Sequence, residues 1–111
     1  MATITRGSDH TGDRYKYDFK LCPASQGWAQ LDTRQDASYY GNWVNPITYE
    51  LFSYTEGDLT HTKCEDEADF ITTTRACVEW HKEHGYFIGI DPGNRASREA
   101  FERMGLGEYL H

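Results

Sequence analysis

Three residues in one short segment have the types and spacing of a metal site. Cys77, His81 and His84 are separated by four and three positions, which places all three on one side of a helix. Zn²⁺ accepts Cys and His ligands and prefers four of them, so His61 or Cys64 would complete the set. That side of the helix also carries its apolar residues, where a cysteine behaves as a small buried hydrophobe. We therefore interpret the triplet as part of the core, expect no metal or other cofactor, and keep the three residues as candidate ligands.

A cysteine nucleophile is the second chemistry that the residue types allow. Cys64 or Cys77 would need a histidine as its base, and the chain has no recognisable nucleophile motif. The acids that follow Cys64 (Glu65, Asp66 and Glu67) are expected to raise the pKa of its thiol and to disfavour the thiolate. The three cysteines include no CxxC pair and no signal peptide is recognised, which predicts reduced thiols in a cytoplasmic protein.

Paired carboxylates could perform acid–base catalysis. This chemistry needs two groups that are held in different environments. The acids available for it all lie in segments that read as turns, where Asp is common for backbone reasons alone. They are Asp32, Asp36, Glu56, Asp58 and Asp91. We interpret these residues as structural.

The acidic residues are concentrated in one stretch. Between Glu56 and Asp69 there are six acids and one base, Lys63, so this stretch holds −5 of the net charge of −7. The functional interpretation is a surface that contacts a basic groove, with carboxylates in place of phosphates. The structural alternative is a solvated hairpin followed by a charged helix start. The candidate binding residues of this acidic patch are Glu56, Asp58, Glu65, Asp66 and Asp69.

A second candidate binding segment runs from Asp32 to Trp43. It is rich in Arg, Gln, Tyr and Trp, and interface hot spots favour Trp, Tyr and Arg. The candidate residues are Arg34, Gln35, Tyr39, Tyr40 and Trp43. The alternative is a loop that leads into a strand whose aromatic side chains enter the core.

Two periodicities predict the elements that position these residues. Alternation of apolar and polar residues, interrupted by Gly, Pro and Asn, predicts strands at 15–21, 28–31, 38–44, 47–54 and 59–63. The spacing then changes to three and four, which predicts one long amphipathic helix over about 66–84, with acids in its first turn and Gly85 at its end. A short strand at 86–90, a turn at 91–93 and a short helix capped by Asn94 follow. The predicted fold class is α+β, with an antiparallel β-meander of about five strands.

The strand at 47–54 has apolar residues on both faces. Ile47, Tyr49 and Leu51 lie on one face, and Phe52 and Tyr54 lie on the other. This pattern indicates a central strand that is covered on both sides, or an exposed Tyr face kept for a partner. In the second case a copy of the chain could bind there, so a homodimer is possible.

Length and charge limit the classes of function. The 111 residues fit a single domain, which we place at 14–111 behind a flexible, polar N-terminal arm at 1–13. The net charge of −7 argues against direct binding to nucleic acid and against anionic membrane surfaces. No apolar run approaches the length of a membrane span. The expected partner is a protein, and a basic one.

Several strings in the chain form one pattern. Between Trp28 and Asp58 the chain reads W-A-Q-L-D-T-R-Q-D-A-S-Y-Y-G-N-W-V-N-P and then Y-T-E-G-D. Cys64, the I-D-P-G string at Ile90 to Gly93 and the ending G-L-G-E-Y-L-H complete the pattern. This pattern resembles a group of short uncharacterised bacterial proteins carried largely on plasmids and other mobile elements. The resemblance covers most of the chain after the N-terminal arm and implies an accessory, transfer or anti-defence role. It assigns no catalytic residues.

Three functions follow from these observations. The clustered charge, the 16 aromatic residues and the lack of a catalytic motif favour a non-catalytic binding protein, for example an inhibitor that uses an acidic, Tyr/Trp-rich surface. The five histidines keep a small metal-dependent or acid–base enzyme as an alternative. A structural or assembly subunit is the third.

Overall fold

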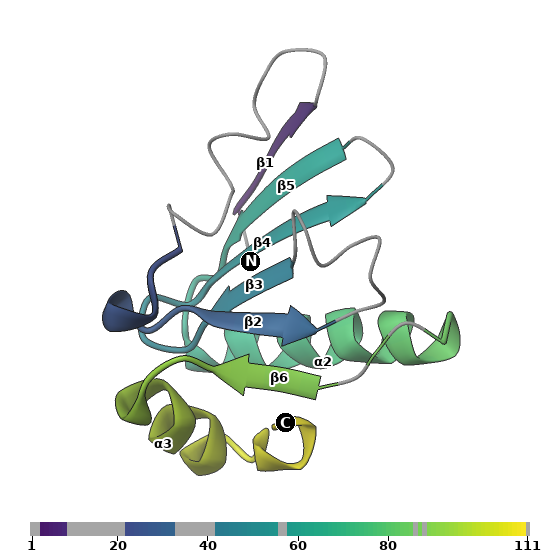
Figure 1. Cartoon of the computed structure of the whole chain (residues 1–111). Helices are drawn as coiled ribbons and strands as arrows, with labels where there is room; N and C mark the ends of the chain where they lie inside the picture. Colours follow the sequence, from purple (N-terminus) through teal and green to yellow (C-terminus); the bar gives the residue numbers. More distant parts are fainter. Residues whose placement is uncertain are drawn as a thin grey trace.

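The chain folds as an α+β domain built on one antiparallel sheet (Figure 1). The computed structural model describes residues 3–8, 22–32, 42–55, 58–85, 87 and 89–110. Within these residues the strand order is β1-β5-β4-β3-β2-β6. The strands are β1 (Thr3–Ser8), β2 (Ala29–Asp32), β3 (Asn42–Asn45), β4 (Glu50–Thr55), β5 (Asp58–Lys63) and β6 (Gly89–Pro92). The helices are η4 (Ala24–Gln26), α2 (Glu67–Glu83), α3 (Arg95–Arg103) and η5 (Gly107–Tyr109).

Strands β2 to β5 form the predicted meander. Each pairs with the next, and β1 and β6 add to its two edges. The register aligns Ala29, Val44 and Leu51 across three strands, and all three are buried. Because side chains alternate along a strand, their sequence neighbours point to the opposite face. The sheet therefore has one face in the core and one face turned away from it.

Helix α2 covers the core face, and it lies behind the sheet in Figure 1. Its buried residues are Phe70, Thr74, Val78 and His81, spaced four, four and three, as expected for one side of a helix. Phe70 and Val78 belong to the same buried cluster as the sheet residues. The predicted helix at about 66–84 is confirmed, because periodicity and capping are local signals.

The C-terminal segment closes the bottom of the core. Phe101 of α3 lies 6.5 Å from Phe70 of α2, measured between ring centroids. Leu106 is fully buried, and Leu110 forms a parallel bridge with Ile90 of β6. The predicted short helix after Asn94 is confirmed, with the Asn94 side chain accepting the N–H of Ser97.

Within the segment that was expected to form an N-terminal arm, Thr3–Ser8 forms the edge strand β1. Six residues pair in register with β5, from Thr3 opposite Lys63 to Ser8 opposite Asp58. Thr and Ile have high strand propensity, but the pairing joins residues far apart in the sequence. No local pattern could reveal it. The rest of the predicted arm and the predicted strand at 15–21 lie outside the described residues.

The predicted strand at 47–54 begins later, at Glu50. The Oδ1 atom of Asn45 accepts the N–H groups of Ile47 and Thr48, which turns the chain before β4. As a result Ile47 is 51% exposed, and Tyr49 takes a φ of 63°. Strand β4 then lies between β3 and β5, so both of its edges are paired within the sheet.

The boundary between β6 and the turn that follows it also differs from expectation. The segment Asp91–Pro92 was expected to turn, but it ends β6 and pairs with β2. Proline is compatible with this place because it stands at the end of an edge strand, where no donor is required. The turn falls instead at Gly93 and Asn94, directly before α3. For the predicted strand at 38–44, the described part is β3.

Candidate functional site

The described members of the predicted acidic patch lie at the beginning of α2. Asp66 is the N-cap, and its Oδ1 accepts the N–H of Asp69 at 2.9 Å. Asp69 accepts the N–H of Glu65 at 2.9 Å through Oδ2. Glu65 and Asp66 are nevertheless exposed, so these carboxylates both stabilise the helix end and contribute negative charge to the surface. Glu56 and the side chain of Asp58 lie outside the described part of the protein.

Of the predicted aromatic and polar segment, the structure describes Trp43. This residue lies on β3, is half-buried, and points to the sheet face away from α2 because its neighbour Val44 points into the core. Arg34, Gln35, Tyr39 and Tyr40 lie outside the described residues.

The face of the sheet opposite α2 carries a row of aromatic rings. The register places Trp43, Phe52 and His61 side by side on β3, β4 and β5. Phe52 stacks on His61, with ring centroids 4.4 Å apart, and on Trp28, 5.1 Å apart. Of this row, Trp43 was selected from the sequence as a binding candidate, and His61 was named only as a possible fourth metal ligand. The one signal for the rest was apolar Phe52 on the face opposite Leu51.

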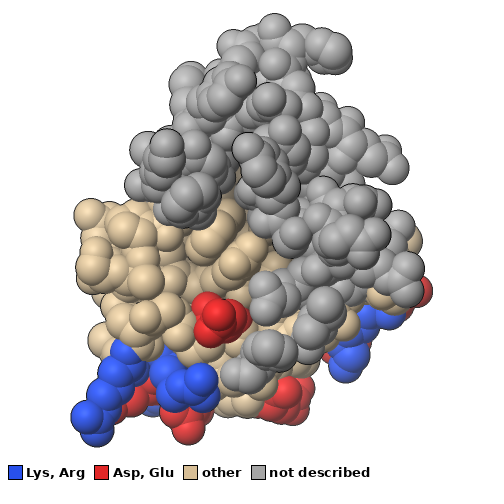
Figure 2. Space-filling view, viewed as in Figure 1, with Lys and Arg blue, Asp and Glu red and all other residues tan. Residues whose placement is uncertain are grey.

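A histidine–carboxylate pair stands at one end of this row. The Nε2 atom of His61 lies 2.8 Å from Oε2 of Glu50, and both side chains are about a quarter exposed. Such a pair can hold and transfer a proton. Figure 2 shows this side of the molecule, where the described surface is mostly uncharged, with one acidic group near the middle of the view and most other charged side chains toward the lower and right margins. The aromatic row therefore presents stacked rings and one polar pair, His61 with Glu50, on the face of the sheet away from α2.

The predicted triplet is divided between the core and the surface. His81 is buried, and its Nδ1 donates to the carbonyl oxygen of Cys77 at 2.7 Å. Burial lowers the pKa of His81 and raises the pKa of the Cys77 thiol to about 11. His84 is exposed, and its Nδ1 donates to the carbonyl oxygen of Trp80 at 2.7 Å. The imidazole of His81 thus bonds to the peptide of Cys77, while the Cys77 thiol stays protonated at neutral pH.

Neither metal binding nor thiolate chemistry gains support from these positions. Within the described ranges, no group of three or more His, Cys, Asp or Glu side chains could hold a metal ion. Burial raises the pKa of Cys64, and the nearby carboxylates of Asp69 and Asp66 raise it further. The three cysteines are free thiols, and two of them, Cys22 and Cys64, are buried.

The outward side of α2 carries an exposed tryptophan that no sequence pattern singled out. Trp80 is 42% exposed, and Ile47 is the other large apolar residue with high exposure among the described side chains. The indole of Trp80 stacks on His84, with ring centroids 3.9 Å apart. Ala68, Thr72 and Ala76 precede it at intervals of four and are also exposed. We call Ala68, Thr72, Ala76 and Trp80 the α2 stripe.

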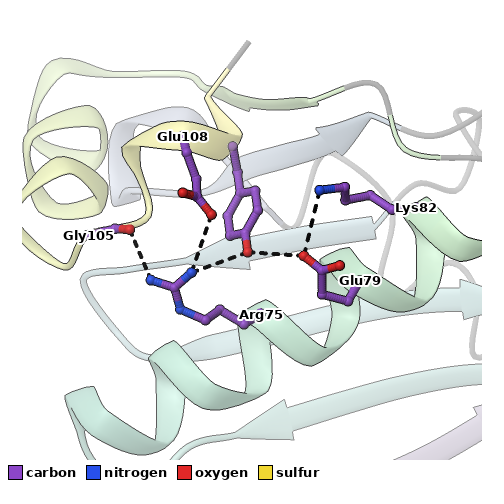
Figure 3. Close-up of polar contacts among 6 residues, drawn as sticks. Arg75, Glu79, Lys82, Gly105 and Glu108 are labelled. Carbon is purple, nitrogen blue, oxygen red and sulfur yellow. Dashed lines mark hydrogen bonds and ion pairs between the residues drawn. The ribbon is translucent and has the colours of Figure 1, made fainter.

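A polar network beside the stripe fixes the C-terminal segment to α2 (Figure 3). Its members are Arg75, Glu79, Lys82, Gly105, Glu108 and Tyr109. The Arg75 guanidinium donates to the carbonyl oxygen of Gly105 at 3.1 Å and to the Tyr109 hydroxyl at 3.3 Å, and pairs with Glu108 at 3.4 Å. Lys82 pairs with Glu79 at 3.7 Å. Both cations of the middle and last turns of α2 are thus engaged within the protein.

Acidic side chains accompany the α2 stripe at both ends. Glu65 and Asp69 lie near its beginning, and Glu79 and Glu83 lie near its end. Of these four, Glu65, Glu79 and Glu83 are exposed and Asp69 is half-buried. The α2 stripe with these four acids, which we call the α2 surface, combines an exposed aromatic anchor, small residues and negative charge. It includes Glu65 and Asp69 from the predicted acidic patch and adds Trp80.

Comparisons with protein-family models, curated proteins and solved structures found no match to this chain. Across the described part of the chain, no helix has both the length and the apolar character that crossing a membrane requires.

Proposed function

We propose that this chain is a non-catalytic binding protein that engages a basic protein partner through the α2 surface. The observation that carries the proposal is the 42% exposure of Trp80 on the outward side of α2, at the end of a row of small residues and beside exposed acids. The exposed cation nearby, Lys82, is paired with Glu79. Interface hot spots are rich in Trp and are surrounded by a polar rim. The acids of the rim would attract a partner of opposite charge and orient it on approach.

The charge of the whole chain supports the same partner class. The net charge is −7, and the cations Arg75 and Lys82 are held in the C-terminal network. A basic protein is attracted to such a surface, whereas nucleic acid and anionic membranes are repelled. In a cytoplasmic setting, and with the resemblance to proteins of mobile elements, the proposal extends to an inhibitor or anti-defence factor that occupies a basic site.

A pull-down with matched variants tests this function. The wild-type chain, Trp80→Ala and Ile47→Ala serve as baits in a lysate of the native host at low salt. We expect a basic protein to be retained by wild type and by Ile47→Ala, lost with Trp80→Ala, and released by high salt, because rim charges are screened. Ile47 is the matched control, since it is also a large apolar residue and 51% exposed but lies in the turn before β4. Recovery of chaperones alone, or of the same proteins with all three baits, would refute the proposal.

The His61–Glu50 pair keeps an acid–base enzyme as the second candidate. Its 2.8 Å contact is the geometry that proton transfer requires. That candidate requires an activity that disappears in both His61→Gln and Glu50→Gln while folding is retained. A panel of hydrolase and isomerase substrates on which wild type and both variants behave alike would remove it.

A further inference from the structure

The α2 stripe has the geometry of a helix-packing ridge. Its four residues recur at intervals of four, so each lies one turn after the last and about 40° further around the helix. The ridge from Ala68 to Trp80 is about 18 Å long at a rise of about 1.5 Å per residue. Ridges of this spacing pack into the grooves between the corresponding ridges of a second helix, at a crossing angle of about −50°. The side of α2 that carries Phe70 and Val78 is already packed against the sheet.

The residue sizes along the ridge suit close packing at its centre and anchoring at its end. Thr72 and Ala76 occupy the middle, where small side chains allow two helix axes to approach to about 8 Å. Trp80 stands at the end of the ridge and is held against His84 by ring stacking at 3.9 Å. A ring that is already oriented loses less conformational entropy when a partner covers it.

The charges around the ridge determine which kind of helix can pack on it. A second copy of this chain packed antiparallel about residue 74 would bring Glu83 against Glu65, and Glu79 with its partner Lys82 against Asp69. The Glu83–Glu65 contact would be repulsive in each half of such a dimer. A helix with Lys or Arg at its flanks would instead meet an acid at each end of the ridge. The acids at the beginning of α2 are fixed there by capping, since Asp66 and Asp69 accept backbone N–H groups.

We infer that the α2 surface takes one basic, amphipathic helix of a partner protein. The partner helix crosses α2 along the ridge, places apolar side chains against Thr72, Ala76 and Trp80, and carries Lys or Arg toward the acids at both ends. This inference rests on the proposed function, because it specifies the form in which the basic partner is bound. It excludes an extended basic tail and a second copy of the chain as the main occupant.

Two displayed peptide libraries of equal length and composition test the inference. In the first, randomised positions lie on the surface of a fixed helical scaffold. In the second, the same residues are presented in an unstructured, proline-containing frame. Each library is selected on the wild-type chain, and the enriched peptides are then measured against four variants. These are Trp80→Ala, Ala76→Gln, Glu65→Gln/Glu83→Gln and the control Ile47→Ala, with folding of each verified by circular dichroism.

We expect binders from the helical library, with apolar residues at helical spacing and basic flanks. Trp80→Ala should weaken them about 30-fold or more, as truncation of a Trp anchor does. Ala76→Gln should weaken them by preventing close approach without any change of charge, and Ile47→Ala should have no effect. The double Gln variant should reduce affinity most at low salt.

The possible failures separate the two proposals. Binders that come only from the unstructured library, and that still need Trp80 and the acids, would overturn the helical form of the partner and leave the basic-partner function standing. Failure of both libraries to yield binders sensitive to Trp80→Ala would overturn both. Self-association of the wild-type chain that Ala76→Gln abolishes would replace the partner helix by a second copy.

Discussion

Replacing Gly27 with alanine tests the contact that holds the start of β2 against the turn between β3 and β4. Gly27 has a φ of 98°, which L-residues adopt only with strain. A Cβ atom there would lie 2.7 Å from Cγ1 of Ile47 and 2.9 Å from Oδ1 of Asn45. That oxygen accepts two N–H groups of the turn, and the Asn45 amide donates to the carbonyl oxygen of Gln26 at 3.0 Å. The substitution therefore disturbs a fully buried side chain on which the turn depends.

The expected loss has two separable parts. The left-handed backbone costs about 1–2 kcal/mol for a residue with a Cβ, and overlap in a packed region costs about 1–3 kcal/mol. Gly27→Ala should therefore lower the free energy of unfolding by about 2–5 kcal/mol, a large share of the ~5–15 kcal/mol of a typical domain. Gly85→Ala is the control for the backbone part. Gly85 has a φ of 72°, and apart from its chain neighbours no described atom lies within 4 Å of where an alanine Cβ would stand, so Gly85→Ala should lose only about 1–2 kcal/mol.

Urea unfolding of five proteins measures both parts. They are the wild type, Gly27→Ala, Gly85→Ala, Ile47→Ala and the double variant Gly27→Ala/Ile47→Ala. In the Ile47→Ala background the effect of Gly27→Ala should shrink, because the Cγ1 contact is gone, but should not disappear, because Asn45 remains. Equal losses for the two glycine variants, or a Gly27→Ala effect unchanged by removal of the Ile47 side chain, would refute the steric reasoning.

Two further predictions concern α2. Asp66→Ala should lower the free energy of unfolding by about 1 kcal/mol, because the N–H of Asp69 loses its acceptor. Asp66→Asn should retain most of the stability, because Asn is also a good N-cap. Equal losses for the two variants in urea unfolding would contradict the capping role. The folded-state pKa of His81 is lowered by burial, so the unfolded chain binds a proton more readily and stability should decline as pH falls below about 6.5, the ordinary His value. The contribution of this group to the slope of unfolding free energy against pH cannot exceed about 1.4 kcal/mol per pH unit. His81→Gln should flatten the curve of urea midpoint against pH between neutral and mildly acidic conditions. An unchanged slope in His81→Gln would be the contrary result.

Local signals accounted for the helices and for most of the meander. The spacing of Phe70, Thr74 and Val78 and the acids at its first turn defined α2 to within about one residue at each end. The strands at Ala29–Asp32 and Asp58–Lys63 were likewise located from alternation. The start of β4 was missed because the Asn45 side chain, rather than strand propensity, determines the backbone at Ile47 and Thr48.

The candidate site was only partly accessible from the sequence. Glu65 and Asp69 were selected from their charge and do lie at the surface of α2. Trp80 was not selected, because an aromatic residue in an amphipathic helix gives no sign of whether the core covers it. The pairing of Phe52 with His61 was also inaccessible, since it requires the register of β4 against β5.

By itself, the sequence determined the α+β class, the long helix with its capping acids, and the concentration of negative charge around residues 56–69. These properties are set by interactions between residues that are close in the sequence, such as helix capping and the periodic spacing of apolar side chains. Tertiary structure alone decided that Thr3–Ser8 would be an edge strand and that Trp80 would face outward. Both depend on which surfaces meet when distant segments pack, because hydrogen-bond pairing and burial are properties of the whole fold.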